Sequence, residues 1–303
     1  MSRPGVVLHP RHPRGVEEAL RSLDITLVVP DEDALPTAIG ERGILVTFVW
    51  DELFLPGLRW VQSISAGHDQ FPHDLFSQQG IVLTSASGVH GPQVAEHAFA
   101  LLLALSRGVA VATRNAVEKT WQPMMLHELA GATMGVLGLG AVGEEIARRA
   151  KAWGMTVVGT KRKPDGYDGV ADEVLAPEHT GEVFRRADAV VSALPGGTAT
   201  DGIVTREMLE SLGGWFVNVG RGNVVNETDI IAALDSGGLL GAGLDVFATE
   251  PLPASSPLWH HRRVVLTPHT AGFSPHYGRR LAAIVSDNLR AFGGEGEWRN
   301  RIV

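Results

Sequence analysis

The sequence predicts an α/β protein of two domains, each built on a parallel sheet. Three observations lead to this prediction. Short apolar runs alternate with helical segments along the 303 residues, a long apolar helical stretch separates two series of such runs, and the second series opens with a glycine-rich loop. Continuous apolar runs are typical of strands covered on both faces. A chain of this length is also long enough for two domains of ordinary size.

Five apolar runs in the first third of the chain are predicted strands. They cover residues 5–8, 25–29, 44–49, 59–64 and 81–84, and a helical stretch over 15–23 connects the first two. The second series contains six further runs, over 134–137, 155–159, 189–193, 215–219, 241–244 and 264–266. Alternating strands and helices of this kind specify a doubly wound sheet.

Two long helices are predicted outside these series. One covers residues 94–117 and is rich in Ala and Leu, with apolar side chains on most sides of its first half. Such a helix is buried on more than one face or packs against another subunit. The other covers residues 275–292, close to the last residue of the sequence.

The composition excludes several classes of protein. The formal charge of −8 argues against a general nucleic-acid binder. There is no cysteine, so disulfides and thiolate metal sites are excluded, and no pair of His residues four apart on a helix suggests a metal. The longest apolar run, over residues 98–105, is shorter than the ~20 residues of a membrane span. We expect a soluble, cytoplasmic protein without a metal, a membrane or a nucleic-acid partner.

A glycine loop follows the first run of the second series. Gly138 permits a tight turn, Gly140 lets the backbone approach a pyrophosphate, and Gly143 allows close packing of helix on strand. The loop opens a helical stretch whose free N–H groups, among them those of Ala141 and Val142, favour a diphosphate. The strand–loop–helix context therefore predicts a dinucleotide site.

Cations stand where a dinucleotide site for NAD usually has a carboxylate. The next strand ends in Thr160, Lys161, Arg162 and Lys163, beside the position of the adenosine ribose. A carboxylate there would repel a 2′-phosphate, whereas an arginine can bind one bidentately and Thr160 can add a hydroxyl donor. The sequence thus favours NADP(H), with NAD(H) as the alternative.

Three strand ends of the second series carry reactive side chains. Arg221 follows one strand, Glu250 follows the next, and His269 follows a third. In open parallel sheets, ligands bind outside the carboxyl ends of the strands. We therefore expect these three side chains to converge on one crevice. The alternative interpretation, a structural salt bridge between Arg221 and Glu250, is disfavoured by their positions at strand ends together with His269.

These strand ends resemble the signature of the D-isomer specific 2-hydroxyacid dehydrogenase family, and the resemblance runs through nearly the whole chain. It is carried by residues 65–69, 94–97, 105–107, 131 with 138–140, 194–195, 218–222, 245–247, 250–252 and 268–269. The resemblance implies a Rossmann dinucleotide-binding domain over residues 99–271 and a flavodoxin-like substrate domain formed by 1–98 and 272–303.

The resemblance also implies the roles of the catalytic residues. His269 is the proton donor in the reduction of a 2-keto acid and the base in the reverse reaction. Glu250 accepts a hydrogen bond from His269 and orients its ring. Arg221 holds the substrate carboxylate and polarises the carbonyl.

Further contacts are expected with the substrate and the cofactor. By resemblance, the backbone around Ala66 and Gly67 helps to hold the substrate carboxylate, and His68, like His90, is a candidate contact because it lies in a glycine-containing loop. The resemblance implies cofactor contacts at Leu194, Pro195, Thr200, Val219 and His269, in addition to the glycine loop and the cations, and a contact between Asp245 and the nicotinamide carboxamide.

The predicted function is the NADPH-dependent reduction of a small 2-keto acid to a D-2-hydroxy acid, and the reverse reaction. The alternatives are a phosphite dehydrogenase of the same family and a nucleotide-sensing protein that resembles the family's corepressors. We expect a homodimer formed through the apolar helix from Val94 to Leu105, because an exposed run of this kind would be a liability on a monomer.

Overall fold

The structure, a computed structural model, describes residues 3–303 and consists of two compact units. One unit runs up to His90 and resumes with Phe273–Val303, and the other comprises Gly91–Gly272. The first two residues of the predicted domain 1–98 lie outside the described residues. The chain enters the second unit at Gly91, the first residue of a helix, which is earlier than the residue 99 expected from the sequence.

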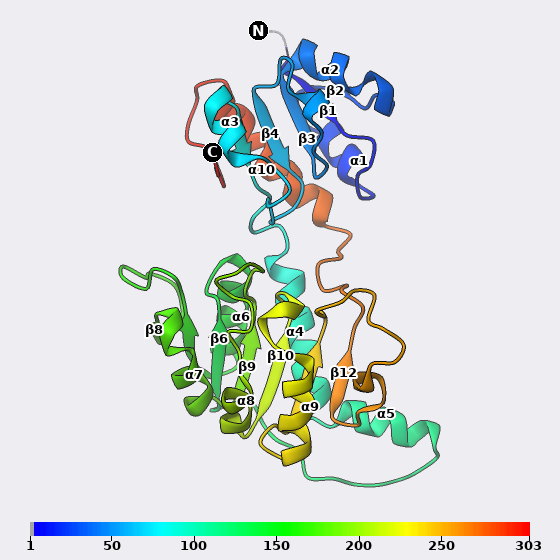
Figure 1. Ribbon diagram of the computed structural model, residues 1–303, viewed down its shortest axis with the longest axis vertical. Coiled ribbons are helices and arrows are strands. Elements are labelled where there is room, and N and C mark those ends of the chain that lie inside the picture. Colours follow the sequence, from blue (N-terminus) through cyan, green and yellow to red (C-terminus); the bar gives the residue numbers. More distant parts are fainter. Residues whose placement is uncertain (1–2) are drawn as a thin grey trace. The chain divides into compact units, whose positions relative to one another are not determined.

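The first unit contains a five-stranded parallel sheet with the strand order β2-β1-β3-β4-β5 (Figure 1). This is the order of flavodoxin-like sheets, as predicted. Its strands are β1 (Gly5–Leu8), β2 (Thr26–Val28), β3 (Ile44–Thr47), β4 (Trp60–Ser63) and β5 (Val82–Thr84). Its helices are α1 (Val16–Arg21), α2 (Leu35–Arg42), α3 (His73–Gln79) and α10 (Tyr277–Phe292).

Both faces of this sheet are covered by helices. Val6 and Leu8 of β1 pack with residues of α1 and α10, whereas Val7, between them, packs with residues of α2 and α3. Successive side chains of a strand point to opposite faces, so a strand covered on both sides is apolar at every position. This arrangement explains why the strands appear in the sequence as continuous apolar runs.

The second unit contains a seven-stranded parallel sheet with the order β12-β11-β10-β9-β6-β7-β8. Its strands are β6 (Thr133–Leu137), β7 (Thr156–Thr160), β8 (Glu173–Leu175), β9 (Ala189–Ser192), β10 (Trp215–Asn218), β11 (Gly241–Leu244) and β12 (Val264–Leu266). The chain order reverses between β6 and β9, which is the point where doubly wound sheets bind dinucleotides. The predicted fold class is confirmed, and β8 is a strand that the sequence analysis did not predict.

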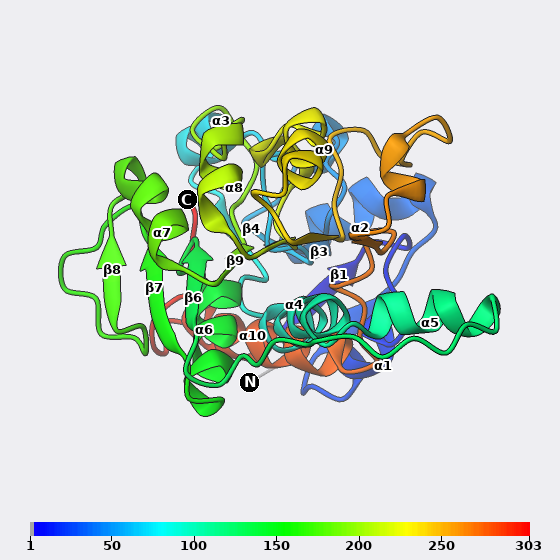
Figure 2. The ribbon, with the colours of Figure 1, turned by 90° about the horizontal axis from the view of Figure 1, so that it is seen from below.

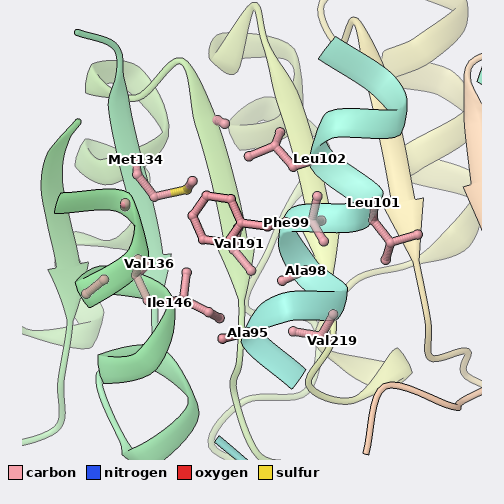
Figure 3. Close-up of a cluster of buried hydrophobic side chains, with 14 of the residues drawn as sticks. Ala95, Ala98, Phe99, Leu101, Leu102, Met134, Val136, Ile146, Val191 and Val219 are labelled. Carbon is pink, nitrogen blue, oxygen red and sulfur yellow. The ribbon is translucent and has the colours of Figure 1, made fainter. Parts of the chain in front are cut away.

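Helices also cover both faces of the second sheet (Figures 1 and 2). The helices α4 (Gly91–Ser106) and α6 (Ala141–Ala152) pack on one face, and α7 (Thr180–Arg186), α8 (Arg206–Leu212) and α9 (Glu227–Ser236) pack on the other. Figure 3 shows Phe99 extending from α4 toward Met134 of β6. Short 3₁₀ helices cover Glu32–Ala34, Glu52–Phe54, Pro177–His179, Gly222–Val224 and Pro257–His260.

The prediction of one helix over residues 94–117 is wrong, because the helix breaks at Gly108. This glycine has a φ of 64°, a left-handed conformation that a continuous helix cannot accommodate. The result is a bend of 65° between α4 and a second helix, α5 (Val109–Val117). In residues 3–303 no single helix is long and apolar enough to span a membrane, and only this bent pair meets the criterion together.

The apolar side chains of α4 are also not exposed as expected. Phe99, Leu101 and Leu102 are buried within the second unit. Several exposed apolar side chains lie farther along the chain, on α5 and on the segment 118–128, which follows α5 without helix or strand (Figure 2). Trp121 and Met125 in that segment are 95% and 94% exposed.

Candidate active site

The glycine loop lies at the carboxyl end of β6 and has the form that a pyrophosphate requires. Gly138 has a φ of 90°, and a side chain at Gly143 would collide with the carbonyl oxygen of Gly138. A Cβ at Gly140, in contrast, would meet nothing within 4 Å. The loop is therefore tight where it packs against β6 and open at Gly140. The residues present fit a dinucleotide phosphate.

The first turn of α6 presents its backbone to this open space. Ala141 is the first residue of the helix and is exposed, and Val142 is half-buried. The first N–H groups of a helix have no partner within it, and they carry the positive end of its dipole. These groups provide the electrostatic environment in which an anion is bound at a helix N-terminus.

The residues at the end of β7 fall into two groups. Thr160 is buried, and its hydroxyl accepts a hydrogen bond from the Gly138 amide at 3.2 Å. Lys161 donates from Nζ to the carbonyl oxygen of Leu139 at 2.6 Å. Both side chains therefore hold the glycine loop. Arg162 and Lys163 are exposed, and within residues 3–303 they form no hydrogen bond or ion pair.

Two further loops follow strands at the same edge of the sheet. Leu194 lies against the glycine loop, with its Cδ2 3.1 Å from where a Cβ of Gly138 would be. The Thr200 hydroxyl donates to the carbonyl oxygen of Pro195 at 2.7 Å and closes the loop that follows β9. Val219, directly after β10, is buried, and its amide donates to the carbonyl oxygen of Ser192 at 3.0 Å.

His269 and Glu250 form a hydrogen-bonded pair. The distance from His269 Nδ1 to Glu250 Oε2 is 2.7 Å, and the other carboxylate oxygen, Oε1, accepts from the amide of Phe247 at 3.0 Å. An ionised carboxylate only accepts hydrogen bonds, so Nδ1 carries the proton that joins the pair. The His269 side chain is 48% exposed. The ring is thus held through one nitrogen and accessible to solvent.

Asp245 supports the turn on which His269 stands. Its carboxylate, 1% exposed, accepts from the Thr267 hydroxyl at 2.6 Å and from the amides of Thr270 and Ala271 at 3.0 Å each. Burial alone would raise the pKa of Asp245, but hydrogen bonds from His97, Thr267 and the two amides outweigh it and hold the pKa below its usual value. The carboxylate of Asp245, which we expected to contact the nicotinamide carboxamide, thus accepts hydrogen bonds from other residues of the protein.

Arg221 follows β10 and is exposed. Its guanidinium donates to the carbonyl oxygen of Gly220 at 2.8 Å. Within the described part of the chain no hydrogen bond or ion pair joins it to Glu250 or to His269, so the alternative of a structural salt bridge does not apply. Strand order places all three residues at the same edge of one sheet, after β10, β11 and β12.

The predicted substrate contacts lie in the first unit, in the loop that follows β4. The Ser65 hydroxyl donates to the carbonyl oxygen of Gly67 and closes a tight turn. The amides of Ala66 and Gly67 donate to no acceptor among residues 3–303. This turn therefore leaves two backbone donors for an anion.

His68, in the same loop, pairs with a second histidine. His68 Nδ1 lies 3.0 Å from His73 Nε2, which is also 3.1 Å from the His68 carbonyl oxygen. Since that carbonyl oxygen can only accept, His73 Nε2 carries a proton and His68 Nδ1 accepts it. Burial and the neighbouring His73 lower the pKa of His68, against a smaller opposing effect of Asp69. A neutral His68 then presents Nε2–H as its free donor.

Sequence reasoning missed three residues that hold the site. His97 lies 2.8 Å from the Thr267 hydroxyl, and Thr267 in turn binds Asp245. His73 supports His68. The only signal in the sequence was the position of Thr267, two residues before His269. Among the described residues no group of three or more His, Asp or Glu side chains is arranged to hold a metal ion.

Known proteins match this chain over most of its length. Residues 99–271 match the family model of the D-isomer specific 2-hydroxyacid dehydrogenase NAD binding domain. A glyoxylate reductase of Korarchaeum cryptofilum is 34% identical over 279 residues, which cover 87% of this chain and 83% of the relative. An (S)-sulfolactate dehydrogenase of Chromohalobacter salexigens is 32% identical over 278 residues, covering 89% of this chain and 90% of the relative.

Solved structures give the same result. A D-isomer specific 2-hydroxyacid dehydrogenase from Xanthobacter autotrophicus Py2, solved with NADPH and MES, superimposes with a TM-score of 0.81 at 27% identity, covering 99% of this chain and 98% of the other. Two parallel sheets, a dinucleotide-binding loop and matches of this extent lead to one conclusion. The chain belongs to the D-isomer specific 2-hydroxyacid dehydrogenase family.

Proposed function

We propose that the protein reduces a small 2-keto acid to a D-2-hydroxy acid with NADPH, and catalyses the reverse reaction. The observation that carries this proposal is the pair of His269 and Glu250 at the edge of the sheet that also carries the glycine loop. The names of the relatives, which include glyoxylate reductase and glyoxylate/hydroxypyruvate reductase, support the class of substrate.

The histidine is the proton donor in this proposal. The nicotinamide, when bound, supplies a hydride to the carbonyl carbon. His269 gives a proton from Nε2 to the carbonyl oxygen, which becomes the hydroxyl group of the product. Glu250 accepts the hydrogen bond from Nδ1–H and stabilises the charged ring before the proton is transferred. The same hydrogen bond orients the neutral ring, which acts as the base in the reverse reaction.

The substrate carboxylate is bound by cationic and backbone donors. Arg221 binds it and polarises the carbonyl, because a guanidinium offers paired donors with a fixed charge. The amides of Ala66 and Gly67 contribute two further donors from the first unit. We assign substrate binding to the first unit, for which the sequence predicted residues 1–98 with 272–303, and cofactor binding to the second unit, for which it predicted residues 99–271. The first unit also offers His68 Nε2–H to a polar group on the substrate.

The preference for NADPH rests on Arg162 and Lys163. These two side chains follow the strand end next to the glycine loop and have no partner among residues 3–303, so they are available to a 2′-phosphate. No carboxylate occupies residues 160–163, where one would repel that phosphate. The family model and the neighbours support a nicotinamide dinucleotide.

The test is an assay of NADPH oxidation with a panel of keto acids that includes glyoxylate, hydroxypyruvate, pyruvate and phenylpyruvate. We expect turnover with at least one of them and a loss of about 10²–10⁴-fold in kcat/KM in His269→Ala. The control is His260→Ala, an exposed histidine of a 3₁₀ helix. No oxidation with any keto acid would contradict the proposal, and binding of NADPH without turnover would then favour a nucleotide sensor.

We further propose a homodimer in which the second copy covers the segment 109–126. This segment, rather than the buried run of α4, carries most of the exposed large apolar side chains of the second unit. They include Val109, Val117, Trp121, Met125 and Leu126. An exposed apolar surface of this kind is typical of a protein–protein interface.

A further inference from the structure

A chain of hydrogen bonds joins helix α4 to the turn that carries His269. His97 Nε2 lies 2.8 Å from the Thr267 hydroxyl oxygen, and this oxygen lies 2.6 Å from Asp245 Oδ1. His97 Nε2 is also 3.4 Å from the same carboxylate oxygen. The three side chains come from α4, from the end of β12 and from the end of β11.

The direction of each bond follows from the chemistry of the groups. The buried Asp245 is ionised at neutral pH, because hydrogen bonds hold its pKa low, and an ionised carboxylate only accepts. The Thr267 hydroxyl therefore gives its single proton to Asp245. The same oxygen can then only accept from His97, so His97 carries a proton on Nε2. All three groups are fixed in one arrangement.

This arrangement determines where His269 lies. Asp245 binds the amides of Thr270 and Ala271 through its side chain, and its carbonyl oxygen accepts from the His269 amide at 2.8 Å. His269 has a φ of 51°, a conformation that is unfavourable for residues other than glycine. The surrounding hydrogen bonds maintain it. A shift of Thr267 would therefore move the backbone of His269, two residues away.

We propose that His97 is a positioning residue for His269 and acts through Thr267 and Asp245. This inference rests on the proposed function, in which His269 transfers the proton. His97 does not need to touch substrate or cofactor for this role. Proton transfer is sensitive to displacements of about 1 Å, which can cost about 10²-fold in rate.

The first experiment measures kcat and KM for the best keto acid of the panel in His97→Leu, Thr267→Val and the double variant. We expect kcat to fall about 10- to 100-fold in His97→Leu, with KM changed less than about threefold. In His97→Gln the amide Nε2 can replace the lost donor, so this variant should stay within about threefold of the wild type. In the Thr267→Val background, His97→Leu should add nothing further.

A second variant separates positioning from general stability. Leu102→Ala removes a buried apolar side chain of the same helix that takes part in none of the network's hydrogen bonds, and should lower Tm without lowering kcat of the folded protein. A kcat loss in Leu102→Ala as large as that in His97→Leu would overturn the inference. Additive effects of His97→Leu and Thr267→Val would overturn it as well.

A third measurement does not depend on activity. In the cofactor-free protein, hydrogen–deuterium exchange of the amides of residues 269–271 should be at least about tenfold faster in His97→Leu than in the wild type or in Leu102→Ala. Unchanged exchange in His97→Leu overturns the positioning role, whatever the kinetics show. If instead His269→Ala retains full activity while exchange responds as expected, the proposed function fails and the structural coupling stands.

Discussion

Lys161 Nζ donates a hydrogen bond to the carbonyl oxygen of Leu139, so the first cation after β7 is part of the support of the glycine loop. The aromatic ring of Tyr167 also lies 5.8 Å from this ammonium group. Lys161 is consequently committed to the conformation of the loop. In the proposed NADPH-dependent reaction, we therefore expect selectivity between the two cofactors to depend on Arg162 and Lys163, whose side chains have no partner among residues 3–303.

This division predicts different kinetics for the three cations. Arg162→Ala with Lys163→Ala should raise KM for NADPH by about tenfold or more and leave KM for NADH nearly unchanged, because a contact that forms only with the 2′-phosphate is lost. Lys161→Ala should raise KM for NADPH and KM for NADH by similar factors, because it loosens the glycine loop that both cofactors use. Steady-state kinetics with each cofactor measure this, and a selective loss of NADPH in Lys161→Ala would contradict it.

The glycine loop predicts a contrast between two substitutions of the same size. Gly140→Ala places a methyl group in open space at a φ of −99°, which any residue adopts, so thermal unfolding should change little. The methyl group would, however, occupy the place of the pyrophosphate, and Kd for NADPH should rise by at least about tenfold.

In Gly143→Ala, by contrast, we expect the main effect on the stability of the fold rather than directly on cofactor binding. Its methyl group would collide with the carbonyl oxygen of Gly138, a backbone atom that cannot move without displacing β6 or α6. We expect a loss of about 1–3 kcal/mol in the free energy of unfolding, with cofactor affinity reduced as a consequence. Calorimetry and cofactor titration of both variants check the contrast. Equal thermal stability of the two variants would refute it.

Most strands of both sheets were predictable because they are covered on both faces and are therefore apolar at successive positions. β8 escaped this criterion, since it has three residues at the edge of the sheet and begins with the exposed Glu173. The break at Gly108 escaped as well. A single glycine is compatible with a helix, and its left-handed conformation is set by packing that the sequence does not show.

The candidate site divides in the same way. Arg221, Glu250 and His269 could be proposed as site residues because each follows a predicted strand, and parallel strands bring such residues to one edge. The support of His269 could not be identified, because His97 and Thr267 are 170 positions apart in the sequence. Likewise, three consecutive cations in the sequence indicate positive charge. They do not show that one of them, Lys161, is already bonded to a backbone carbonyl oxygen of the glycine loop.

Glu250→Gln tests the pair at the centre of the proposed mechanism. The amide keeps the size of the side chain but removes the charge, and its NH₂ group would face either the amide of Phe247 or Nδ1–H of His269. A charged imidazole ring would then lose its stabilising partner, so kcat should fall by about 10²-fold or more while NADPH affinity is retained. Retention of more than a tenth of kcat would contradict the role of Glu250.

His68 predicts a dependence of stability on pH. Burial and His73 hold the pKa of His68 below its ordinary value of 6.5, so the folded protein takes up this proton less readily than the unfolded chain. The contribution of neutral His68 to stability is complete above pH 6.5 and is lost as the pH falls through the folded-state pKa.

His68→Gln removes this titration. The fall in Tm between pH 7.5 and 5 should therefore be smaller in the variant than in the wild type, with His260→Gln, an exposed histidine, as the matched control. Thermal denaturation at each pH measures the difference. Parallel curves for the wild type and His68→Gln would show that His68 contributes no such dependence.

The exposed apolar side chains of the segment 109–126 predict the state of assembly. A dimer formed through this segment has twice the mass of the 32.3 kDa chain. Trp121→Glu with Met125→Glu should convert it to the single chain, because two charges would have to be buried in an apolar interface without partners. Phe273→Glu is the control, since Phe273 is 79% exposed but lies outside this segment. Sedimentation equilibrium at micromolar concentration distinguishes the outcomes. A wild-type protein that sediments as a single 32.3 kDa species would refute the dimer, and a dimer that persists in the double variant would place the interface elsewhere.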